Sequence, residues 1–466
     1  MKLWQRFGFC LIVGAAIWFS PTPSGVEPEG WRVLAVFVAT IVSFLLRPLP
    51  MGAMTLIALV FLAATNTLSF KQTLAGFSDT TVWLVVAAFL IAGTVARTGL
   101  GRRVALIMVT KLGRTTLGLG YAATITEFIL GALVPSNTAR GGGVMAPVMN
   151  SLSNALGSTP GKSPRRAGEY LMLVGAHANL IAAASFLTGM AANPLVSAAA
   201  KTAFDVEFEW LTWLTGSIVP ALVSVALLPL FIYKLRPPQI KQGREAVQNA
   251  RGELKEMGPL SRDEKIMAGV FVSMLVLWAS KPLHGLATGV VALIGVCVLL
   301  ITHADTWKNA TGLAPAWDTL VWLGGLLAMA NMLKEFGVVD WFASEMQTYV
   351  SGMSGFWVAI ILALIYFYSM YGFTMLTGHI AAMAGAFFAV ALAAGTPPLL
   401  MVALIAYFSN LCGCTTNYST GPFCIYYGLG YVEIGTWYRV GFLVSLLHIS
   451  VWLGVGLVWW KILGWW

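Results

Sequence analysis

Long apolar stretches separated by short polar segments dominate the chain. Most are close to the roughly 20 residues that an α-helix needs to cross a bilayer. Eleven of them lie at 7–20, 31–46, 52–68, 80–97, 169–200, 211–233, 266–280, 286–302, 319–334, 399–430 and 438–462. Two further regions, 117–157 and 356–397, are too long for one span and are interrupted by polar residues and glycines. The pattern predicts about eleven transmembrane helices and two segments with a more complex path.

The composition excludes the soluble classes of protein. Hydrophobic residues make up 58% of the chain and charged residues only 10%, whereas a soluble domain has roughly a quarter of its residues charged. The long continuous apolar runs also exclude a transmembrane β-barrel, whose short strands alternate apolar and polar residues. The expected fold class is therefore an all-α polytopic protein with the lipid bilayer as its surroundings.

The net charge of +9 comes from basic residues that gather in a few loops. They occur at the N-terminus and in 97–114, 162–166 and 234–265, whereas acidic residues dominate 201–210. Because cytoplasmic loops carry the excess of Lys and Arg, the basic loops and the N-terminus are predicted to be cytoplasmic and the C-terminus external. A nucleic-acid partner is not needed to explain the charge. The first apolar stretch also resembles a signal peptide, and we expect it to remain as a helix.

The region 117–157 has basic loops on both sides, so both of its ends are predicted to lie in the cytoplasm. Its middle reads Pro135-Ser-Asn-Thr-Ala-Arg-Gly-Gly-Gly143, which is unsuited to an external loop beside lipid. Irregular backbone at membrane depth is tolerated only where protein buries it or where it lines a cavity. We therefore expect a re-entrant hairpin whose tip lies inside the protein.

An internal repeat relates the two halves of the chain. The segment Asp79-Thr-Thr-Val-Trp-Leu84 recurs as Asp318-Thr-Leu-Val-Trp-Leu323, an offset of 239 residues. Each copy is predicted to start a helix that reaches a glycine, and these glycines are Gly99 and Gly337. The same offset carries Ser136-Asn-Thr138 onto Met375-Leu-Thr377, in the middle of the second interrupted region. Such internal similarity is a primary indicator of architecture.

A third pair of segments, Phe186–Pro194 and Tyr418–Pro422, follows in the same order with an offset of 232 residues. An insertion of the basic loop 158–168 in the first half accounts for the difference. Five full spans separate the two copies, so the second copy is predicted to be inverted in the membrane. Inverted repeats with broken helices that meet near the midplane are typical of secondary transporters.

The repeat also predicts the organisation of the chain. The expected segments are N-terminal scaffold helices (1–78), a first repeat (79–233) with a cytoplasmic hairpin (117–157) and a broken helix (169–200), a cytoplasmic linker (234–265), further scaffold helices (266–317), and a second repeat (318–466) with an external hairpin (356–397), a broken helix (399–430) and a last helix. Within the linker, the mixed charges of 243–264 predict a solvated segment.

The tips and breaks offer chemistry that suits an anionic substrate. Helix ends expose unpaired N–H groups with partial positive charge, and Ser, Asn and Thr add neutral donors beside them. Glycine permits close backbone approach, and proline frees a carbonyl. Two such half-sites, one from each repeat, fit a dicarboxylate. The predicted substrate-binding residues are Ser136, Asn137, Thr138, Thr188, Gly189, Thr377, Gly378, Thr420, Gly421 and Pro422.

Other polar residues in the apolar regions leave alternatives open. Arg140 either attracts anions or pairs with Glu127, and Glu127 is alternatively a proton site. His379 beside Thr377 either contacts substrate, titrates or has a structural role. His177 and Asn179, on the helix before the first break, are interpreted as helix-packing residues.

The motifs Pro135–Gly143 and Thr416-Asn-Tyr-Ser-Thr-Gly-Pro422, followed by Ile425–Tyr431, resemble the divalent anion/sodium symporter family. Within it the resemblance is to bacterial citrate/succinate and tartrate/succinate antiporters and plastid 2-oxoglutarate/malate translocators. The resemblance covers essentially the whole chain. It implies a homodimer of eleven-span protomers, each with a scaffold and an elevator-type transport domain. Because no plastid transit peptide precedes the first helix, a bacterial inner membrane is the expected location.

The resemblance also implies roles for individual residues. Ser136, Asn137 and Thr138 match a tip that binds substrate carboxylates and, in coupled members, sodium. Only Thr377 matches the second tip, because Met375 and Leu376 depart from the motif, which puts a second sodium site in doubt. No cofactor is expected. The alternative of a sodium site is confined to the surroundings of Ser136, Asn137 and Gly189.

The expected function is exchange of a cytoplasmic dicarboxylate, such as succinate, malate or 2-oxoglutarate, for an external di- or tricarboxylate. Sodium-coupled dicarboxylate symport is the first alternative, and an inorganic-anion transporter or channel is the second. An enzyme is not expected, because no catalytic set of Ser, His and Asp or of metal ligands converges in the sequence.

Overall fold

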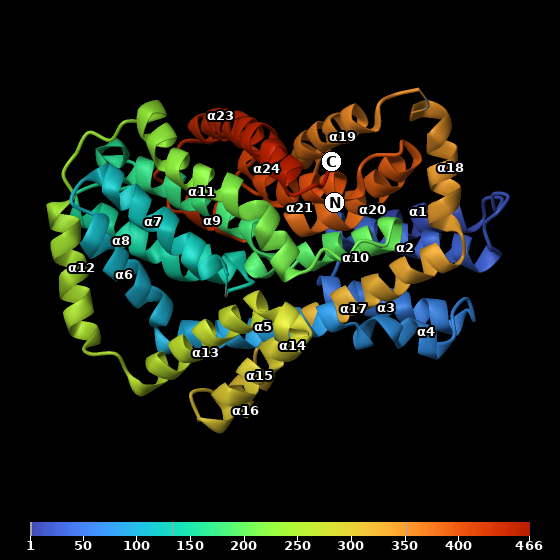
Figure 1. Cartoon of the computed structure of the whole chain (residues 1–466), viewed down its shortest axis with the longest axis horizontal. Helices are drawn as coiled ribbons and strands as arrows, with labels where there is room; N and C mark the ends of the chain where they lie inside the picture. The colour runs from blue at the N-terminus through green and yellow to red at the C-terminus, as the bar shows by residue number, and fades with distance from the viewer. Residues whose placement is uncertain (1, 133, 351) are drawn as a thin grey trace.

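The computed structural model describes residues 2–132, 134–350 and 352–466, which fold into helices and their connections (Figure 1). The one β-pairing in these residues is an isolated bridge between Thr115 and Gln242. Eight helices in the described chain are long and apolar enough to cross a membrane, and three shorter apolar helices accompany them. The prediction of an all-α polytopic membrane protein is confirmed.

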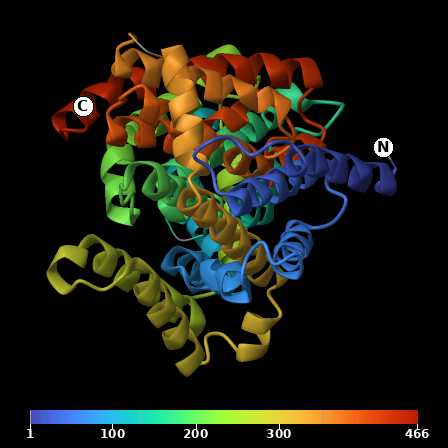
Figure 2. The same ribbon diagram turned by 90° about the vertical axis from the view of Figure 1, so that its right-hand side faces the viewer.

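The helices form two groups joined at both ends of the molecule (Figures 1 and 2). The first group contains α1 (Leu3–Trp18), α2 (Pro28–Leu46), α3 (Met51–Ala64), α4 (Phe70–Leu74), α5 (Thr80–Thr98), α13 (Arg262–Ala279), α14 (Lys281–His284), α15 (Thr288–Ile301), α16 (Trp307–Thr311) and α17 (Ala314–Glu335). The second contains α7 (Thr116–Gly131), α8 (Ala146–Ala155), α9 (Gly168–Ser185), α10 (Asn193–Phe204), α11 (Trp210–Leu235), α19 (Gly355–Ser369), α20 (Leu376–Ala393), α21 (Pro398–Leu411), α22 (Gly421–Gly428), α23 (Ile434–Val451) and α24 (Leu457–Ile462).

Three amphipathic helices connect the groups: α6 (Leu100–Leu112) and α12 (Arg244–Met257) at one end, and α18 (Val338–Val350) at the other (Figure 1). The chain enters α6 and α18 through Gly99 and Gly337, each at φ +77°. That left-handed conformation favours glycine, because a Cβ would clash with the backbone. The two predicted helix-ending glycines therefore occupy equivalent turns between the groups.

The two Asp-Thr copies differ in how they start their helices. Asp79 lies just before α5, and its carboxylate accepts a hydrogen bond from the Thr81 N–H at 2.7 Å, as an N-cap does. The prediction that Asp318 starts the second helix is wrong: α17 begins at Ala314, with Pro315 in its first turn, so Asp318 lies inside it. Proline is favoured at the start of a helix, and here it moves the boundary upstream.

The prediction of a solvated segment at 243–264 is also incorrect in part. Residues Arg244–Met257 form α12, which buries Ala246, Val247 and Ala250 and packs against α6 and α8. Most of its charged residues are exposed on the other side, whereas Glu253 lies on the packed face and accepts a hydrogen bond from Ser151 of α8. The segment therefore holds the first hairpin to the helix α6.

Backbone hydrogen bonds join the three basic loops. The N–H groups of Gln239 and Ile240 donate to the carbonyls of Arg165 and Arg166, both at 3.0 Å, and the Thr116 N–H donates to Lys241 at 3.0 Å. These loops therefore lie on the same side of the molecule, and so do the start of α7 and the end of α8. That placement gives the segment from α7 to α8 the path of a hairpin.

The region 356–397 has the same path. Helices α19 and α20 pack against each other. A Cβ on Gly355, where α19 starts, would lie 2.5 Å from the carbonyl oxygen of Gly395, just beyond the end of α20. The two ends of this segment are thus adjacent, and its turn lies at the opposite end of the two helices.

Candidate functional site

The tip of the first hairpin, called the first tip below, is the segment between α7 and α8. Helix α7 ends at Gly131, and the π-helical segment η2 (Thr138–Met145) leads into α8. Pro135 has no N–H with which to continue α7, and the Ser136 hydroxyl accepts a hydrogen bond from the Ala139 N–H at 3.1 Å. The side chains of Asn137, half-buried, and Thr138, exposed, make no hydrogen bond to any described residue. These two side chains are thus available to a ligand.

The interruption of the second broken helix, between α21 and α22, is called the second break. It lies directly against the first tip. Helix α21 continues through η6 (Cys412–Thr415), and the chain is then extended until α22 begins at Gly421. A Cβ on Gly421 would lie 2.3 Å from the hydroxyl of Thr138, so only glycine permits this contact. The hydroxyls of Thr416 and Thr420 are buried and have no hydrogen-bond partner among the described residues. Buried polar groups in folded proteins are nearly always paired, so these hydroxyls are candidate ligand contacts.

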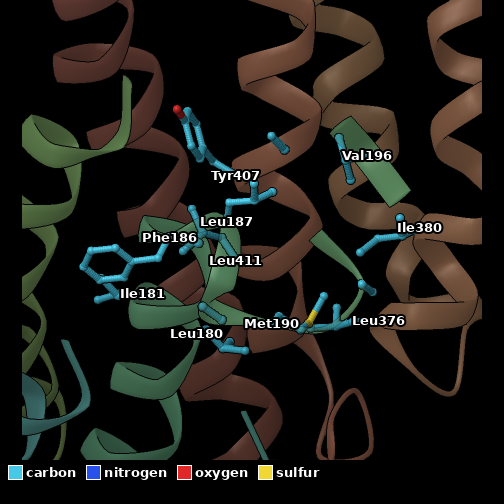
Figure 3. Packing of buried hydrophobic residues seen from close by; sticks show 14 of the residues in the cluster. Leu180, Ile181, Phe186, Leu187, Met190, Val196, Leu376, Ile380, Tyr407 and Leu411 are labelled. Carbon is cyan, nitrogen blue, oxygen red and sulfur yellow. The ribbon is translucent and has the colours of Figure 1, made fainter. Parts of the chain in front are cut away.

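The turn of the second hairpin, between α19 and α20, is called the second tip. It also contacts the second break. Helix α20 begins at Leu376, whose N–H donates to the Ser419 carbonyl at 2.9 Å. Thr377 and Gly378 therefore lie in the first turn of α20, where the N–H groups have no helical partner. The Leu376 side chain is buried against Gly413, and it belongs to the apolar cluster around Leu180 and Met190 (Figure 3). The second tip therefore presents backbone and a Thr hydroxyl, with no amide side chain.

The interruption between α9 and α10, called the first break, is stabilised by hydrogen bonds of its own side chains. Helix α9 ends at Ser185 and α10 begins at Asn193. The Thr188 hydroxyl donates to the Ala132 carbonyl at 2.8 Å and accepts from the indole of Trp210 at 3.2 Å. Thr188 thus ties the break to α7 and α11, and its hydroxyl is already engaged in this structure. Gly189 is surrounded by backbone of α9, which leaves no space for a Cβ.

A buried ion pair links the first tip to the first break. The Arg140 guanidinium donates from Nε to Glu127 at 2.7 Å, and both side chains are fully buried. It also donates to three backbone carbonyls, those of Val134 at 2.7 Å, Gly189 at 3.0 Å and Asn179 at 3.2 Å. The alternative of an Arg140–Glu127 pair is confirmed. The guanidinium therefore occupies three backbone carbonyl oxygens between the first tip and the first break.

Asn179 completes this network, because its side-chain amide donates to Glu127 at 3.0 Å and to the Asn137 carbonyl at 3.2 Å. The interpretation of Asn179 as a helix-packing residue is thus too narrow, because it fixes the backbone of a tip residue. His177 lies on the same helix and packs its ring against Phe423, with centroids 5.3 Å apart. One oxygen each of Glu127 and Asn179 remains buried without a partner among the described residues.

The second break is the common neighbour of the two tips. It contacts the first tip through Thr138 and Gly421, and the second through Leu376 and Ser419. The predicted residues of the tips and of the second break therefore come together, whereas the Thr188 hydroxyl is used elsewhere. Thr416 was missed as a site residue, although it begins the motif Thr416–Pro422.

His379 closes the second hairpin. Its Nε2 lies 2.8 Å from the hydroxyl of Ser369, at the end of the opposite limb. Replacing His379 with leucine is expected to cost about 0.5–1.5 kcal/mol, the net worth of one hydrogen bond, and to leave measurable transport. Thermal unfolding in detergent and transport assays measure the two effects, with His379→Gln as the variant that keeps a polar group. Complete loss of transport at an unchanged melting temperature would instead show that His379 contacts substrate.

Comparison with known proteins assigns the family. Residues 1–466 match the family described as "Sodium:sulfate symporter transmembrane region". A putative malate transporter of Bacillus subtilis (strain 168) is 46% identical over 455 residues, covering 97% of this chain and 95% of the relative. The chloroplastic dicarboxylate transporter 1 of Spinacia oleracea is 39% identical over 459 residues, which are 98% of this chain and 81% of the relative. The citrate/succinate antiporter of Escherichia coli (strain K12) is 36% identical over 487 residues, with coverages of 100% and 99%.

A solved structure, that of the YdaH transporter of Alcanivorax borkumensis, has the same fold. The TM-score is 0.57 at 13% sequence identity, and the match covers 99% of this chain and 97% of the other. The family model that matches residues 1–466 and the relatives that match nearly the whole chain show the family: the chain belongs to the divalent anion/sodium symporter family.

Proposed function

We propose that this protein exchanges dicarboxylates across the bacterial cytoplasmic membrane. Succinate, malate or 2-oxoglutarate would leave the cell as another di- or tricarboxylate enters. Relatives named as malate, dicarboxylate and citrate/succinate transporters support this substrate class. The site supports it too, because the second break lies between two tips that each carry neutral donors.

One carboxylate of the substrate would be bound by the side chains of Asn137 and Thr138, with the Thr420 hydroxyl beside them. The other would be bound at the N-terminus of α20, by Thr377 and Gly378. The partial positive charge at a helix N-terminus favours an anion there. Both half-sites use neutral donors, so an empty site would bury no uncompensated charge.

The position of Arg140 is the observation that favours exchange over sodium-coupled symport. Its guanidinium donates to the Val134 and Gly189 carbonyls, and Gly189 is one of the three residues around which the sequence places the alternative sodium site. Because Glu127 neutralises this guanidinium, Arg140 adds no net charge, and it supports exchange by occupying carbonyl oxygens that a sodium ion would otherwise use. At the second tip, Leu376 has no side-chain oxygen to offer a second sodium, and its side chain is buried among apolar residues.

Sodium-coupled symport is the alternative, and the family description, which names sodium and sulfate, is what favours it. Inorganic sulfate is a competing substrate for the same reason. Sulfate carries its charge on one centre, whereas the two half-sites are separated by the second break. The geometry therefore favours a longer anion with a carboxylate at each end.

The mechanism we propose is an elevator movement of the second helix group, which contains both tips and both breaks, against the first. Helices α6, α12 and α18 connect the groups. Gly99 and Gly337, whose backbone is in the left-handed conformation, form the turns at which α6 and α18 can reorient. We further propose inverted repeats, a homodimer built on the first group, and a cytoplasmic N-terminus with an external C-terminus.

A competition experiment tests the substrate class. Proteoliposomes preloaded with succinate would take up labelled succinate, and unlabelled malate, 2-oxoglutarate, citrate and sulfate would be added outside. We expect saturable uptake that dicarboxylates inhibit and equimolar sulfate does not. Inhibition by sulfate alone would identify an inorganic-anion transporter, and uptake that rises linearly with concentration would identify a channel.

A further inference from the structure

A cavity of about 540 Å³ lies beside the first hairpin, on the side of the basic loops. Its walls come from α5, α6, the η2–α8 limb and α12, and include Ala139, Gly143 and Pro147. Small-molecule sites have volumes of about 300–1,000 Å³, so this cavity has room for a small dicarboxylate. Because Ala139 directly follows the exposed Thr138, the cavity ends next to the proposed substrate contacts.

The cavity carries one basic side chain, Arg102, which pairs with Glu253 at 2.7 Å. This pair differs from the two other ion pairs made by arginines nearby. Arg97 pairs with Asp305, and Arg103 with Glu264, and both carboxylates are at least 95% buried. The Arg102 side chain is 57% exposed. Its partner Glu253 is 16% exposed, more than Asp305 or Glu264, and ion pairs that solvent reaches contribute little, so Arg102 can exchange partners at a lower cost than Arg97 or Arg103.

Glu253 remains satisfied if Arg102 leaves it. One of its carboxylate oxygens accepts hydrogen bonds from the Ser151 hydroxyl and from the Asn249 amide, each at 2.9 Å. Arg102 uses the other oxygen. Release of Arg102 therefore leaves no orphaned carboxylate at the cavity wall, and Glu253 stays fixed between α12 and α8.

We propose that this cavity is a cytoplasmic vestibule, and that Arg102, released from Glu253, is the first residue to bind a dicarboxylate on its way to the first tip. A guanidinium suits a carboxylate because it offers paired donors in a fixed plane. The proposal rests on the proposed transport function. It adds a binding residue that serves only the cytoplasmic side of the exchange.

Two substitutions with opposite expected effects test the role of Arg102. Arg102→Gln should raise the KM for cytoplasmic succinate about threefold to fivefold, the size of one solvent-screened charge contact, and leave the external KM unchanged. Glu253→Gln, which keeps the contact to Ser151 and frees Arg102, should lower the cytoplasmic KM. Arg251→Gln, on the exposed face of α12 and outside the cavity, is the matched control. Equal damage from both variants, or equal effects on both sides of the membrane, would overturn the proposal.

Thiol labelling tests the vestibule without measuring transport. A Cβ at Gly143 would meet no atom within 4 Å, so Gly143→Cys fits the structure. The exposed Cys297 and Cys424 would first be replaced by serine. A membrane-impermeant maleimide should label this cysteine in inside-out vesicles and not in right-side-out vesicles, and succinate should slow the reaction.

Gly252→Cys on α12, which also faces open space, should be labelled at a rate that succinate does not change. Labelling of Gly143→Cys from the outside, or none from the inside, would refute the vestibule even if exchange is demonstrated.

Discussion

Replacing Arg140 with alanine is expected to destabilise the protein by about 3–5 kcal/mol, because it leaves Glu127 charged, fully buried and without its partner. It also removes the donor shared by the carbonyls of Val134, Gly189 and Asn179. Exchange should be lost, because the first tip and the first break then lose the guanidinium that joins the Val134 and Gly189 carbonyls. Thermal unfolding in detergent and succinate exchange measure the two effects.

The same variant tests whether Arg140 stands in for sodium. With the guanidinium gone, the Val134 and Gly189 carbonyls and the Glu127 carboxylate form a cluster of oxygens, which suits a hard cation. We expect sodium chloride to raise the melting temperature of Arg140→Ala more than choline chloride does, and to leave the wild type unchanged. Arg97→Ala, which breaks the pair with Asp305 in the first helix group, is the matched control and should lose stability without gaining a sodium effect. Equal stabilisation of all three proteins by sodium would refute the substitution of Arg140 for a cation.

Replacing Asn137 with alanine is expected to abolish exchange without unfolding the protein. The Asn137 side chain makes no hydrogen bond to any described residue, so its loss should change stability by no more than about 0.5 kcal/mol. A hydrogen bond to a charged group contributes about 1.5–3 kcal/mol, so succinate should bind roughly ten- to hundredfold more weakly. Binding by calorimetry and exchange in proteoliposomes measure this loss.

Asn331→Ala provides the control for that experiment, because Asn331 is an exposed asparagine of α17 in the first helix group. It should bind and exchange succinate as the wild type does. A wild-type exchange rate in Asn137→Ala would remove the first tip from the substrate site. A large fall in its melting temperature would show that Asn137 is structural.

The helices and their breaks were predictable because local chemistry determines them. Pro135 prevents α7 from continuing, and the Asp79 carboxylate caps α5 by accepting a hydrogen bond from the N–H of Thr81 in its first turn. The start of α17 was misplaced because Pro315 favours an earlier boundary than the repeated Asp318. The packing of α12 was also missed, although its small apolar residues Ala246, Val247 and Ala250 lie on one face.

The contacts that shape the site depend on residues distant in sequence, and a single sequence does not contain them. Arg140 meets the Gly189 carbonyl 49 residues away, and the partners of a guanidinium cannot be chosen from spacing alone. Leu376 was recognised as a departure from the motif, but its burial depends on Gly413 in another helix. Thr188 was predicted as a ligand, and its bonds to Ala132 and Trp210 appear only once α7 and α11 are placed.

Uptake of labelled succinate into proteoliposomes, empty or preloaded with unlabelled dicarboxylate, each with and without an inward sodium gradient, tests the account most directly. We predict uptake only into preloaded vesicles, at a rate that sodium does not change, because the Arg140 guanidinium already occupies the Val134 and Gly189 carbonyls at the first tip. Sodium-driven uptake into empty vesicles would contradict the account and identify the protein as a symporter.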